Sequence, residues 1–187
     1  MLADDLRSRG FDCVTTREPG GTTLGRHLRA AFLETKETVT PMAELLAFGA
    51  DRAQHVEFFI KPGIESGKIV ISDRYADATF AYQGAGRGFS EDKVNQIIEL
   101  ATGGLKPDLT LFFDIPIETA VARSSSRHES KKNRMDEESA EFYTRVRNAY
   151  LGVAECEPSR FKVIDARGDV DKIHADVMRV VDGALSI

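Results

Sequence analysis

The sequence of 187 residues has no tryptophan, only two cysteines and no strong excess of charge. Cys13 and Cys156 are too few and too far apart for a disulfide framework or a zinc site, which favours two reduced thiols. The net charge of −5 argues against bulk attraction to nucleic acid. No apolar run approaches the roughly 20 residues of a membrane span, and the first residues lack the basic stretch of a signal peptide. We therefore expect a cytoplasmic protein without nucleic-acid or membrane partners.

The remaining composition is ordinary for one globular domain, with 42% hydrophobic and 29% charged residues. Apolar segments typical of strands lie at 12–16, 68–73, 108–114 and 161–165. Helical spacing of apolar residues occurs at 24–34, 41–61, 91–103, 118–127, 136–155 and 170–185. This alternation predicts a single α/β domain over residues 1–187, with a doubly wound parallel sheet and flanking helices. Ligands of such sheets bind beyond the carboxyl ends of the strands.

The first residues and two glycines add expectations about the edges of these elements. Residues 1–9 have helical spacing, yet an α/β domain seldom begins with a helix that no strand precedes. We expect the sheet to lack its first strand, which would leave an unpaired edge or an exposed apolar groove. Gly10 and Gly63 are expected to end helices, and Asp114 is expected to cap one.

A Pro-Gly-Gly turn follows the first predicted strand and places Arg17 and Glu18 at its carboxyl end. This pattern suits either a substrate site or a plain turn with a surface ion pair. Arg26 and Arg29 follow three residues apart, so they share a helix face. Such a pair either binds phosphate or lies on a solvated surface.

Phe48 and Arg52 lie four residues apart in a predicted helix and project from the same side. An aromatic ring beside a guanidinium suits a base stacked on the ring, with its phosphate or carbonyl held by the arginine. The alternative is a core phenylalanine with a surface arginine.

Asp73 ends a predicted buried strand and is followed at once by Arg74. An acid in this place can bind Mg²⁺ directly or through water, and the arginine can neutralise phosphate charge. Thr79, Tyr82 and Gln83 follow at helical spacings, so their hydroxyl and amide groups can face one pocket and read the edge of a base. A helix cap is the alternative for Asp73, but it leaves these polar neighbours unexplained.

A basic, polar segment at 123–134 lies between two predicted helices. Charge runs of this kind are usually solvated loops. A loop that carries arginine also suits the lid of a phosphoryl-transfer enzyme, which closes over the nucleotide and excludes water.

Taken together, these motifs resemble bacterial thymidylate kinases. The resemblance rests on segments that occur in the order and spacing of that family: TREPGGT, FGADR, ISDRYADATFAYQG, GLKPDLTLFFDIP and NRMDEESAEFYTRVRNAYL. It covers nearly the whole chain. It implies a P-loop kinase fold, a homodimer, and the reaction of ATP with dTMP to give ADP and dTDP with Mg²⁺.

The resemblance also implies roles for single residues. Phe48 matches the ring that stacks on thymine, and Arg52 matches the arginine that contacts base and phosphate. Arg74 matches an arginine near the dTMP phosphate, and Asp73 matches its acidic partner near the metal. Further pocket positions match Glu18, Arg29, Thr79, Tyr82 and Gln83, with the Tyr82 ring under the deoxyribose.

The ATP side is implied by the later motifs. Arg134 matches the catalytic arginine of a lid at about 124–135. The remaining ATP-side positions are Arg127, in the lid, and Asp165, Ala166 and Arg167, in the turn that borders adenine.

The main departure from the family is the start of the sequence. Residues 1–187 contain no Gly-x-x-x-x-Gly-Lys-Ser/Thr loop, whose N–H groups and lysine bind the ATP phosphates. We therefore expect that the chain starts inside the family's first helix and that ATP binding is impaired. The alternatives are a non-catalytic nucleotide-binding remnant, or a kinase for another nucleoside monophosphate, which Thr79, Tyr82 and Gln83 disfavour.

Overall fold

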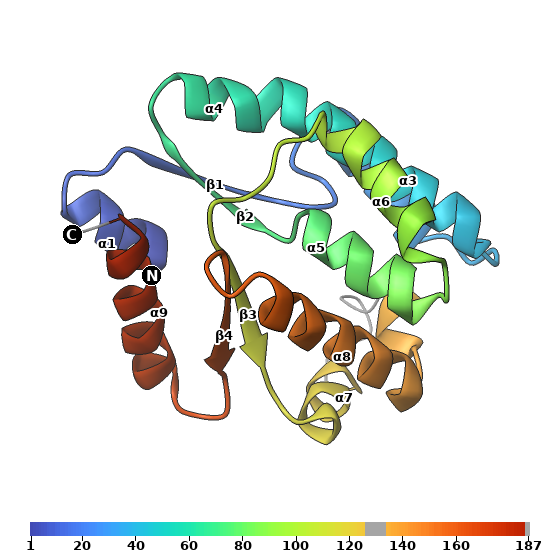
Figure 1. Ribbon diagram of the computed structural model, residues 1–187. Helices are drawn as coiled ribbons and strands as arrows, with labels where there is room; N and C mark the ends of the chain where they lie inside the picture. The colour runs from blue at the N-terminus through green and yellow to red at the C-terminus, as the bar shows by residue number, and fades with distance from the viewer. Residues whose placement is uncertain (126–133, 186–187) are drawn as a thin grey trace.

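The computed structural model in Figure 1 describes residues 1–125 and 134–185. Its strands are β1 (Cys13–Arg17), β2 (Ile69–Asp73), β3 (Thr110–Asp114) and β4 (Phe161–Asp165). β1 pairs in parallel with β2, with Cys13 opposite Ile69, and β3 pairs in parallel with β4. Helices connect the strands throughout (Figure 1). The predicted α/β fold with parallel strands is confirmed.

The four strands do not hydrogen bond as the one predicted sheet. They form two separate two-stranded sheets, because no ladder joins β2 to β3 within the described residues. Side chains connect the sheets instead. Ile71 of β2, Leu111 of β3 and Ile164 of β4 belong to one apolar cluster with helix residues Leu6 and Val177. Apolar packing thus holds the two sheets together, although no backbone hydrogen bonds of a ladder join them within the described residues.

Helices cover both sheets and differ from the predicted ranges by a few residues. The helices are α1 (Leu2–Ser8), α2 (Thr23–Leu33), α3 (Pro41–His55), α4 (Lys61–Glu65), α5 (Ala76–Thr79), α6 (Glu91–Thr102), α7 (Ile117–Ser125), α8 (Ala140–Cys156) and α9 (Val170–Leu185). Two π-helical segments, η1 (Val56–Ile60) and η2 (Phe80–Gly86), continue α3 and α5, and the 3₁₀ segment η4 (Arg134–Glu137) precedes α8. The side chains of Thr22, Thr40 and Ser139 cap α2, α3 and α8.

The two glycines expected to end helices behave differently. Gly10 follows α1 with a φ of 89°, as expected. Gly63 lies inside α4, so that expectation is wrong, and Gly67 with a φ of 79° follows the helix instead. A Cβ on Gly63 would lie 2.9 Å from a methyl group of Val70 in β2. Gly63 is therefore needed for close packing of α4 on the strand.

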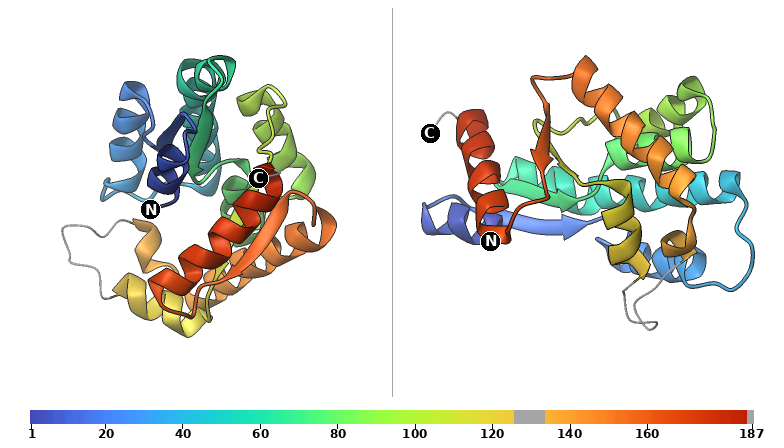
Figure 2. Two further views of the ribbon diagram at one scale, coloured as in Figure 1. Left: turned by 90° about the vertical axis from the view of Figure 1, so that its left-hand side faces the viewer. Right: turned by 90° about the horizontal axis from the view of Figure 1, so that it is seen from below.

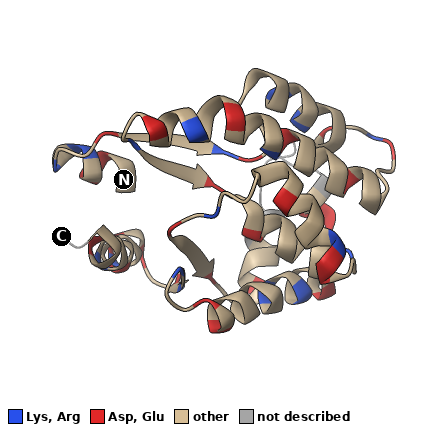
Figure 3. Ribbon diagram, turned by 45° about the horizontal axis from the view of Figure 1, so that its top comes forward, with Lys and Arg blue, Asp and Glu red and all other residues tan. Residues whose placement is uncertain are grey.

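A second apolar cluster positions the candidate site. Phe32 of α2, Phe48 of α3, Met135 of η4, Phe142 of α8 and Ala81 of η2 pack in it. The two terminal helices, α1 and α9, lie side by side at the opposite end of the molecule (Figures 1 and 2). The strands are uncharged along most of their length and end in charged residues (Figure 3). None of the helices in the described parts of the chain has the length and apolar character to cross a membrane.

Candidate nucleotide-binding site

A cavity beside the carboxyl ends of β1 and β2 collects most of the residues that the sequence predicts. Its lining comes from the ends of β1 and β2, from α3, α5 and η2, and from η4. Seven lining residues were predicted and two were not. The predicted ones are Glu18, Phe48, Arg52, Arg74, Thr79, Tyr82 and Gln83, and the others are Ala78 and Met135.

Arg52 is the buried centre of this site, with its side chain 2% exposed. Its Nε donates to Glu18 Oε2 at 2.8 Å, its Nη1 donates to Thr79 Oγ1 at 2.7 Å, and its Nη2 donates to the Tyr75 carbonyl oxygen at 3.0 Å. These three partners fix the plane of the guanidinium. The surface-arginine alternative for Arg52 is therefore wrong, because the helix face that carries it turns toward the strand ends.

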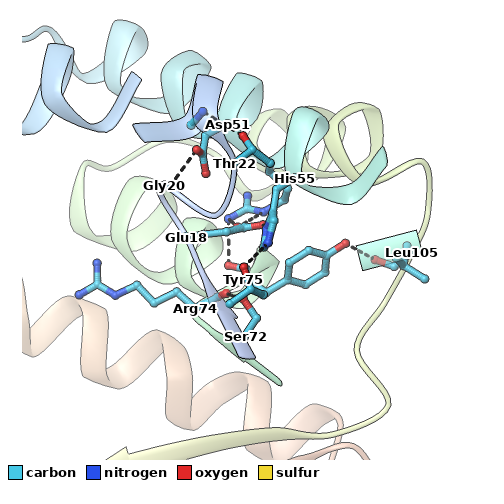
Figure 4. A network of polar contacts seen from close by, with 12 residues as sticks. Glu18, Gly20, Thr22, Asp51, His55, Ser72, Arg74, Tyr75 and Leu105 are labelled. Atoms are coloured by element: carbon cyan, nitrogen blue, oxygen red, sulfur yellow. Dashed lines mark hydrogen bonds and ion pairs between the residues drawn. The ribbon is translucent and has the colours of Figure 1, made fainter. Parts of the chain in front are cut away.

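His55 holds the other side of Glu18. Its Nδ1 lies 2.8 Å from Glu18 Oε1, and its Nε2 lies 2.6 Å from Thr16 Oγ1. The His55 side chain is fully buried. Figure 4 shows His55 and Glu18 facing one another across the end of the strand. Both oxygens of the carboxylate are thus occupied, and the alternative of a plain turn with a surface ion pair at Glu18 is wrong, because Glu18 lies in a buried network.

The glycine-rich turn after Glu18 packs against α3. Gly20 N–H donates to Asp51 Oδ1 at 3.0 Å, and a Cβ on Gly25 would lie 2.3 Å from that oxygen. A Cβ on Gly21 would lie 2.5 Å from His55 Nε2. These glycines therefore allow the turn and the first residues of α2 to approach α3 closely.

Asp51 Oδ2 is buried with no hydrogen-bond partner among the described residues. Burial raises the pKa of the Asp51 carboxyl above its ordinary value, while the hydrogen bond from Gly20 N–H opposes the rise. A buried polar atom without a partner costs free energy that the rest of the fold must supply.

Arg74 differs from Arg52 in being exposed and in carrying backbone strain. Its φ of 73° is the one positive value at a non-glycine residue in the described chain. Its guanidinium lies 5.0 Å from the centre of the Tyr82 ring, and Figure 4 shows the side chain extending away from the Glu18 network. Strain of this kind costs about 1–3 kcal/mol and is commonest at functional sites.

Positive charge gathers around Arg74. Burial lowers the pKa of the Arg29 guanidinium, and the nearby charges of Arg17 and Arg74 lower it further. Arg29 Nη1 also donates to the Pro19 carbonyl oxygen at 3.2 Å, and the Glu18–Pro19 peptide is cis. Three guanidinium groups close enough for two of them to lower the pKa of the third provide a concentration of positive charge that suits an anion.

Aromatic and amide groups complete the cavity. Phe48 packs edge-on against Phe32 with ring centres 4.9 Å apart, which fixes its orientation. Tyr82 packs edge-on against Phe142 at 6.0 Å. The Gln83 amide donates to Glu44 Oε1 at 2.8 Å. A rigid apolar ring and a fixed amide lie in the same cavity as two guanidinium groups, and this combination suits a nucleotide.

Asp73 ends β2 with an exposed side chain and is not among the residues lining the cavity. Within the described residues no group of three or more His, Cys, Asp or Glu side chains is arranged to hold a metal. A lone carboxylate still fits Mg²⁺, which is usually bound by one or two carboxylates together with phosphate oxygens and water.

The residues predicted for the ATP side lie elsewhere. Asp165 ends β4 and accepts hydrogen bonds from the Arg167 backbone N–H at 3.1 Å and from its guanidinium at 2.8 Å. These hydrogen bonds hold the pKa of Asp165 well below its ordinary value. Ala166 N–H donates to the Asp114 carbonyl oxygen at 2.9 Å. The cavity lining includes none of these residues.

The predictions for Asp114, Arg127 and Arg134 have different outcomes. Asp114 does not cap α7, which begins at Ile117, because both its oxygens bind Arg147 at 2.6 and 2.7 Å. Arg127 and most of the predicted lid lie outside the described residues. The backbone of Arg134 begins η4, and its side chain is also outside the description.

The sequence reasoning missed three residues of α3: Glu44, which accepts from Gln83; His55, which contacts Glu18; and Asp51, which accepts from Gly20 N–H. The sequence did contain a signal for Glu44 and His55. Residues 44, 48, 52 and 55 follow one another at spacings of four, four and three and therefore lie on one helix face. Phe48 and Arg52 were placed on that face, and the polar residues one turn before and after belong to it as well. Arg87, which binds Glu44, had no such signal.

The fold and the lining of the cavity are those of an α/β protein suited to a nucleotide at the strand ends. A family model for thymidylate kinase matches residues 1–177. The thymidylate kinase of Desulfovibrio desulfuricans is 47% identical over 171 residues, which cover 88% of this chain and 79% of that protein. A Synechococcus thymidylate kinase is 42% identical over 187 residues, covering 100% and 88%. The crystal structure of the Ehrlichia chaffeensis thymidylate kinase matches with a TM-score of 0.77 and 32% identity, covering 97% and 87%. The chain belongs to the thymidylate kinase family.

Proposed function

We propose that this protein binds dTMP in the cavity and forms the acceptor half of an ATP:dTMP phosphotransferase that yields dTDP. The observation that carries the proposal is the meeting of an aromatic ring, Phe48, with the guanidinium groups of Arg52 and Arg74 in one cavity. Membership of the thymidylate kinase family and the similarity to named thymidylate kinases support it.

The geometry supports a definite placement of the nucleotide. The base stacks on Phe48, whose ring is held by Phe32, and its polar edge meets Arg52 and Gln83. The Tyr82 ring lies under the deoxyribose, where a 2′-hydroxyl would crowd it. Thr79 serves this site through Arg52, since its hydroxyl accepts from that guanidinium at 2.7 Å.

The phosphate of dTMP then lies at Arg74, with Arg29 and Arg17 adding positive charge. A phosphate oxygen of dTMP attacks the γ-phosphoryl group of ATP in line, so catalysis consists of positioning and charge stabilisation. Mg²⁺ bound with Asp73 would supply further charge neutralisation between the phosphates. The resemblance to the family assigns Arg134 a role at the transferring group and gives Arg127, Asp165, Ala166 and Arg167 roles on the ATP side.

A second candidate function is dTMP binding without turnover. The observation that favours it is that the cavity collects residues predicted for dTMP, whereas Asp165, Ala166 and Arg167 on the predicted ATP side lie outside its lining. On this view the described residues bind dTMP without holding ATP for transfer.

Two measurements separate these functions. ADP release is followed in a coupled assay with ATP, Mg²⁺ and each of dTMP, dUMP and dGMP, while calorimetry measures binding of the same nucleotides without ATP. Turnover with dTMP above dUMP and dGMP supports the kinase, and dTMP binding without ADP release supports the second function. Absence of dTMP binding in calorimetry would contradict both candidate functions.

We also propose that the protein forms a homodimer through the α3–α6 side. Three large apolar residues are exposed on α3, η1 and α6: Leu46 at 50%, Phe58 at 72% and Leu100 at 80%. α3 and α6 pack against one another, so two of these side chains lie on adjoining helices. Light scattering should give twice the chain mass, and Leu100→Lys should reduce it. A monomer at micromolar concentration would contradict the proposal.

A further inference from the structure

Gln83 is the buried amide at the base end of the cavity. Its side chain comes from η2 and is 1% exposed overall, yet it lines the cavity beside Phe48 and Tyr82. Gln83 Nε2 donates to Glu44 Oε1 at 2.8 Å. No described residue donates to Gln83 Oε1. One end of the amide is therefore committed to the protein, and the other is left for a ligand.

Glu44 is the reason that the amide has only one orientation. A carboxylate has acceptors and no donor, so the NH₂ end of Gln83 must face it. Turning the amide over would bring two acceptor oxygens together in a buried place. Glu44 is fully buried on α3 and lies one helical turn before Phe48.

Arg87 fixes Glu44 in turn. Its Nε donates to Glu44 Oε1 at 3.1 Å and its Nη2 donates to Glu44 Oε2 at 3.0 Å, which is the two-point pairing of a guanidinium with a carboxylate. Arg87 also pairs with Glu138 Oε1 at 2.6 Å, and its guanidinium lies 4.8 Å from the centre of the Phe142 ring. Arg87 thus pairs with both oxygens of Glu44 and holds the carboxylate beside Gln83.

We infer that Glu44, held by Arg87, is a positioning residue that sets the base selectivity of this site. By accepting from the NH₂ group, it holds the Gln83 amide in the orientation that turns the carbonyl oxygen toward the base. This inference rests on the proposed binding of dTMP. Thymine and uracil carry an N3–H donor that matches this oxygen, whereas cytosine carries an N3 acceptor that opposes it. The site therefore selects keto pyrimidines through a residue that does not touch the base.

A matched pair of nucleotides tests this directly. dTMP and 5-methyl-dCMP share the methyl group, the sugar and the phosphate, and differ only on the edge that Gln83 would read. Calorimetry on the wild-type protein should show dTMP preferred on the order of 100-fold, because one ligand forms the hydrogen bond and the other buries two facing acceptors. Equal affinity for the two nucleotides would overturn the inference without any variant. If neither nucleotide binds, the proposed function itself fails.

Glu44→Gln is the decisive variant. A glutamine at 44 can donate as well as accept, so the Gln83 amide is free to turn and offer N–H to cytosine. The preference for dTMP should fall on the order of tenfold, more than the affinity for dTMP itself falls. A purely structural role would weaken both nucleotides equally and leave the ratio unchanged, and that result would overturn the inference.

Two further variants serve as a control and as a substitute for Glu44→Gln. Glu138→Gln alters the other partner of Arg87 without touching Gln83, so the ratio should stay at the wild-type value. If Glu44→Gln does not fold, Arg87→Lys takes its place: a lysine keeps the positive charge but loses the two-point grip on Glu44. The ratio should then fall below that of Glu138→Gln. Equal ratios in these two variants would count against the inference.

Discussion

Two carboxylate–arginine pairs stand at the carboxyl ends of strands and have opposite surroundings. Glu18 and Arg52 beside β1 and β2 are each 2% exposed, whereas Asp165 and Arg167 after β4 are 53% and 69% exposed. The hydrogen-bond distances are the same, at 2.8 Å. Removing one member of a buried pair leaves the other charge without a partner and away from water, whereas an exposed charge is hydrated. Burial therefore decides how much such a pair contributes to the stability of the protein.

The largest expected effect is that of Glu18→Ala. Arg52 would be left buried with its main counter-charge removed, so the free energy of unfolding should fall by about 3–5 kcal/mol. The melting temperature should fall on the order of 10 °C, as circular dichroism would show. Glu18→Gln is the control, since it keeps an acceptor toward Arg52 and should lose less. A Glu18→Ala protein as stable as the wild type would show that burial does not set the contribution of this pair to stability.

Arg74 extends the contrast between buried and exposed arginines to function, because it is exposed and has a proposed role in catalysis. Arg74→Ala and Arg74→Gly should both lower phosphoryl transfer on the order of 10²–10³-fold and weaken dTMP binding. Their stabilities should differ, because a φ of 73° suits glycine better than alanine. Urea unfolding should find the glycine variant more stable than the alanine variant by about 1 kcal/mol. Near-normal dTMP binding by both variants would remove Arg74 from the site.

Substitution of Asp51 tests how burial affects a carboxylate that is not paired with an arginine. Its pKa is raised in the folded protein, so folding binds a proton between the ordinary value of 3.8 and the raised value. The resulting cost is absent below the ordinary value and complete above the raised one. Asp51→Asn should therefore stabilise the protein by about 1 kcal/mol at neutral pH, with the gain shrinking as pH falls toward 4. Unfolding curves measured across this range check the sign. A gain that grows on acidification would contradict it.

The smallest effect is expected at the exposed pair. Arg167→Ala leaves Asp165 in water, so the melting temperature should equal that of the wild type within error, as scanning calorimetry would record. ATP affinity should fall if the turn borders adenine as proposed. A loss of stability comparable to that of Glu18→Ala would show that burial is not what separates the two pairs.

Much of the fold was predictable because it depends on local pattern. The strand at 161–165 and the helix at 170–185 were predicted with their observed bounds, since an apolar run and a 3.6-residue period are each visible in sequence. The helix expected at 41–61 was predicted less well. It passes through the π-helical segment η1 and continues to Glu65, and no sequence pattern marks a π-helical turn.

The candidate site was predictable where a motif carries its own chemistry. Phe48, Arg52 and Arg74 stood out because aromatic and guanidinium groups recur at nucleotide sites. Glu44, His55 and Arg87 did not, because a buried polar residue acquires its role only from its partners. His55 binds Glu18 across 37 positions of sequence, and Arg87 binds Glu44 across 43.

The sequence by itself determined the kinds of element, the parallel α/β class and the family. These follow from periodicity and from motifs whose spacing is fixed along the chain. Only the tertiary structure decided that the strands pair as two sheets, that Arg52 is buried while Arg74 is exposed, and that the Gln83 amide donates to Glu44. Pairing, burial and amide orientation depend on groups far apart in sequence, and their energies exist only once the chain has folded.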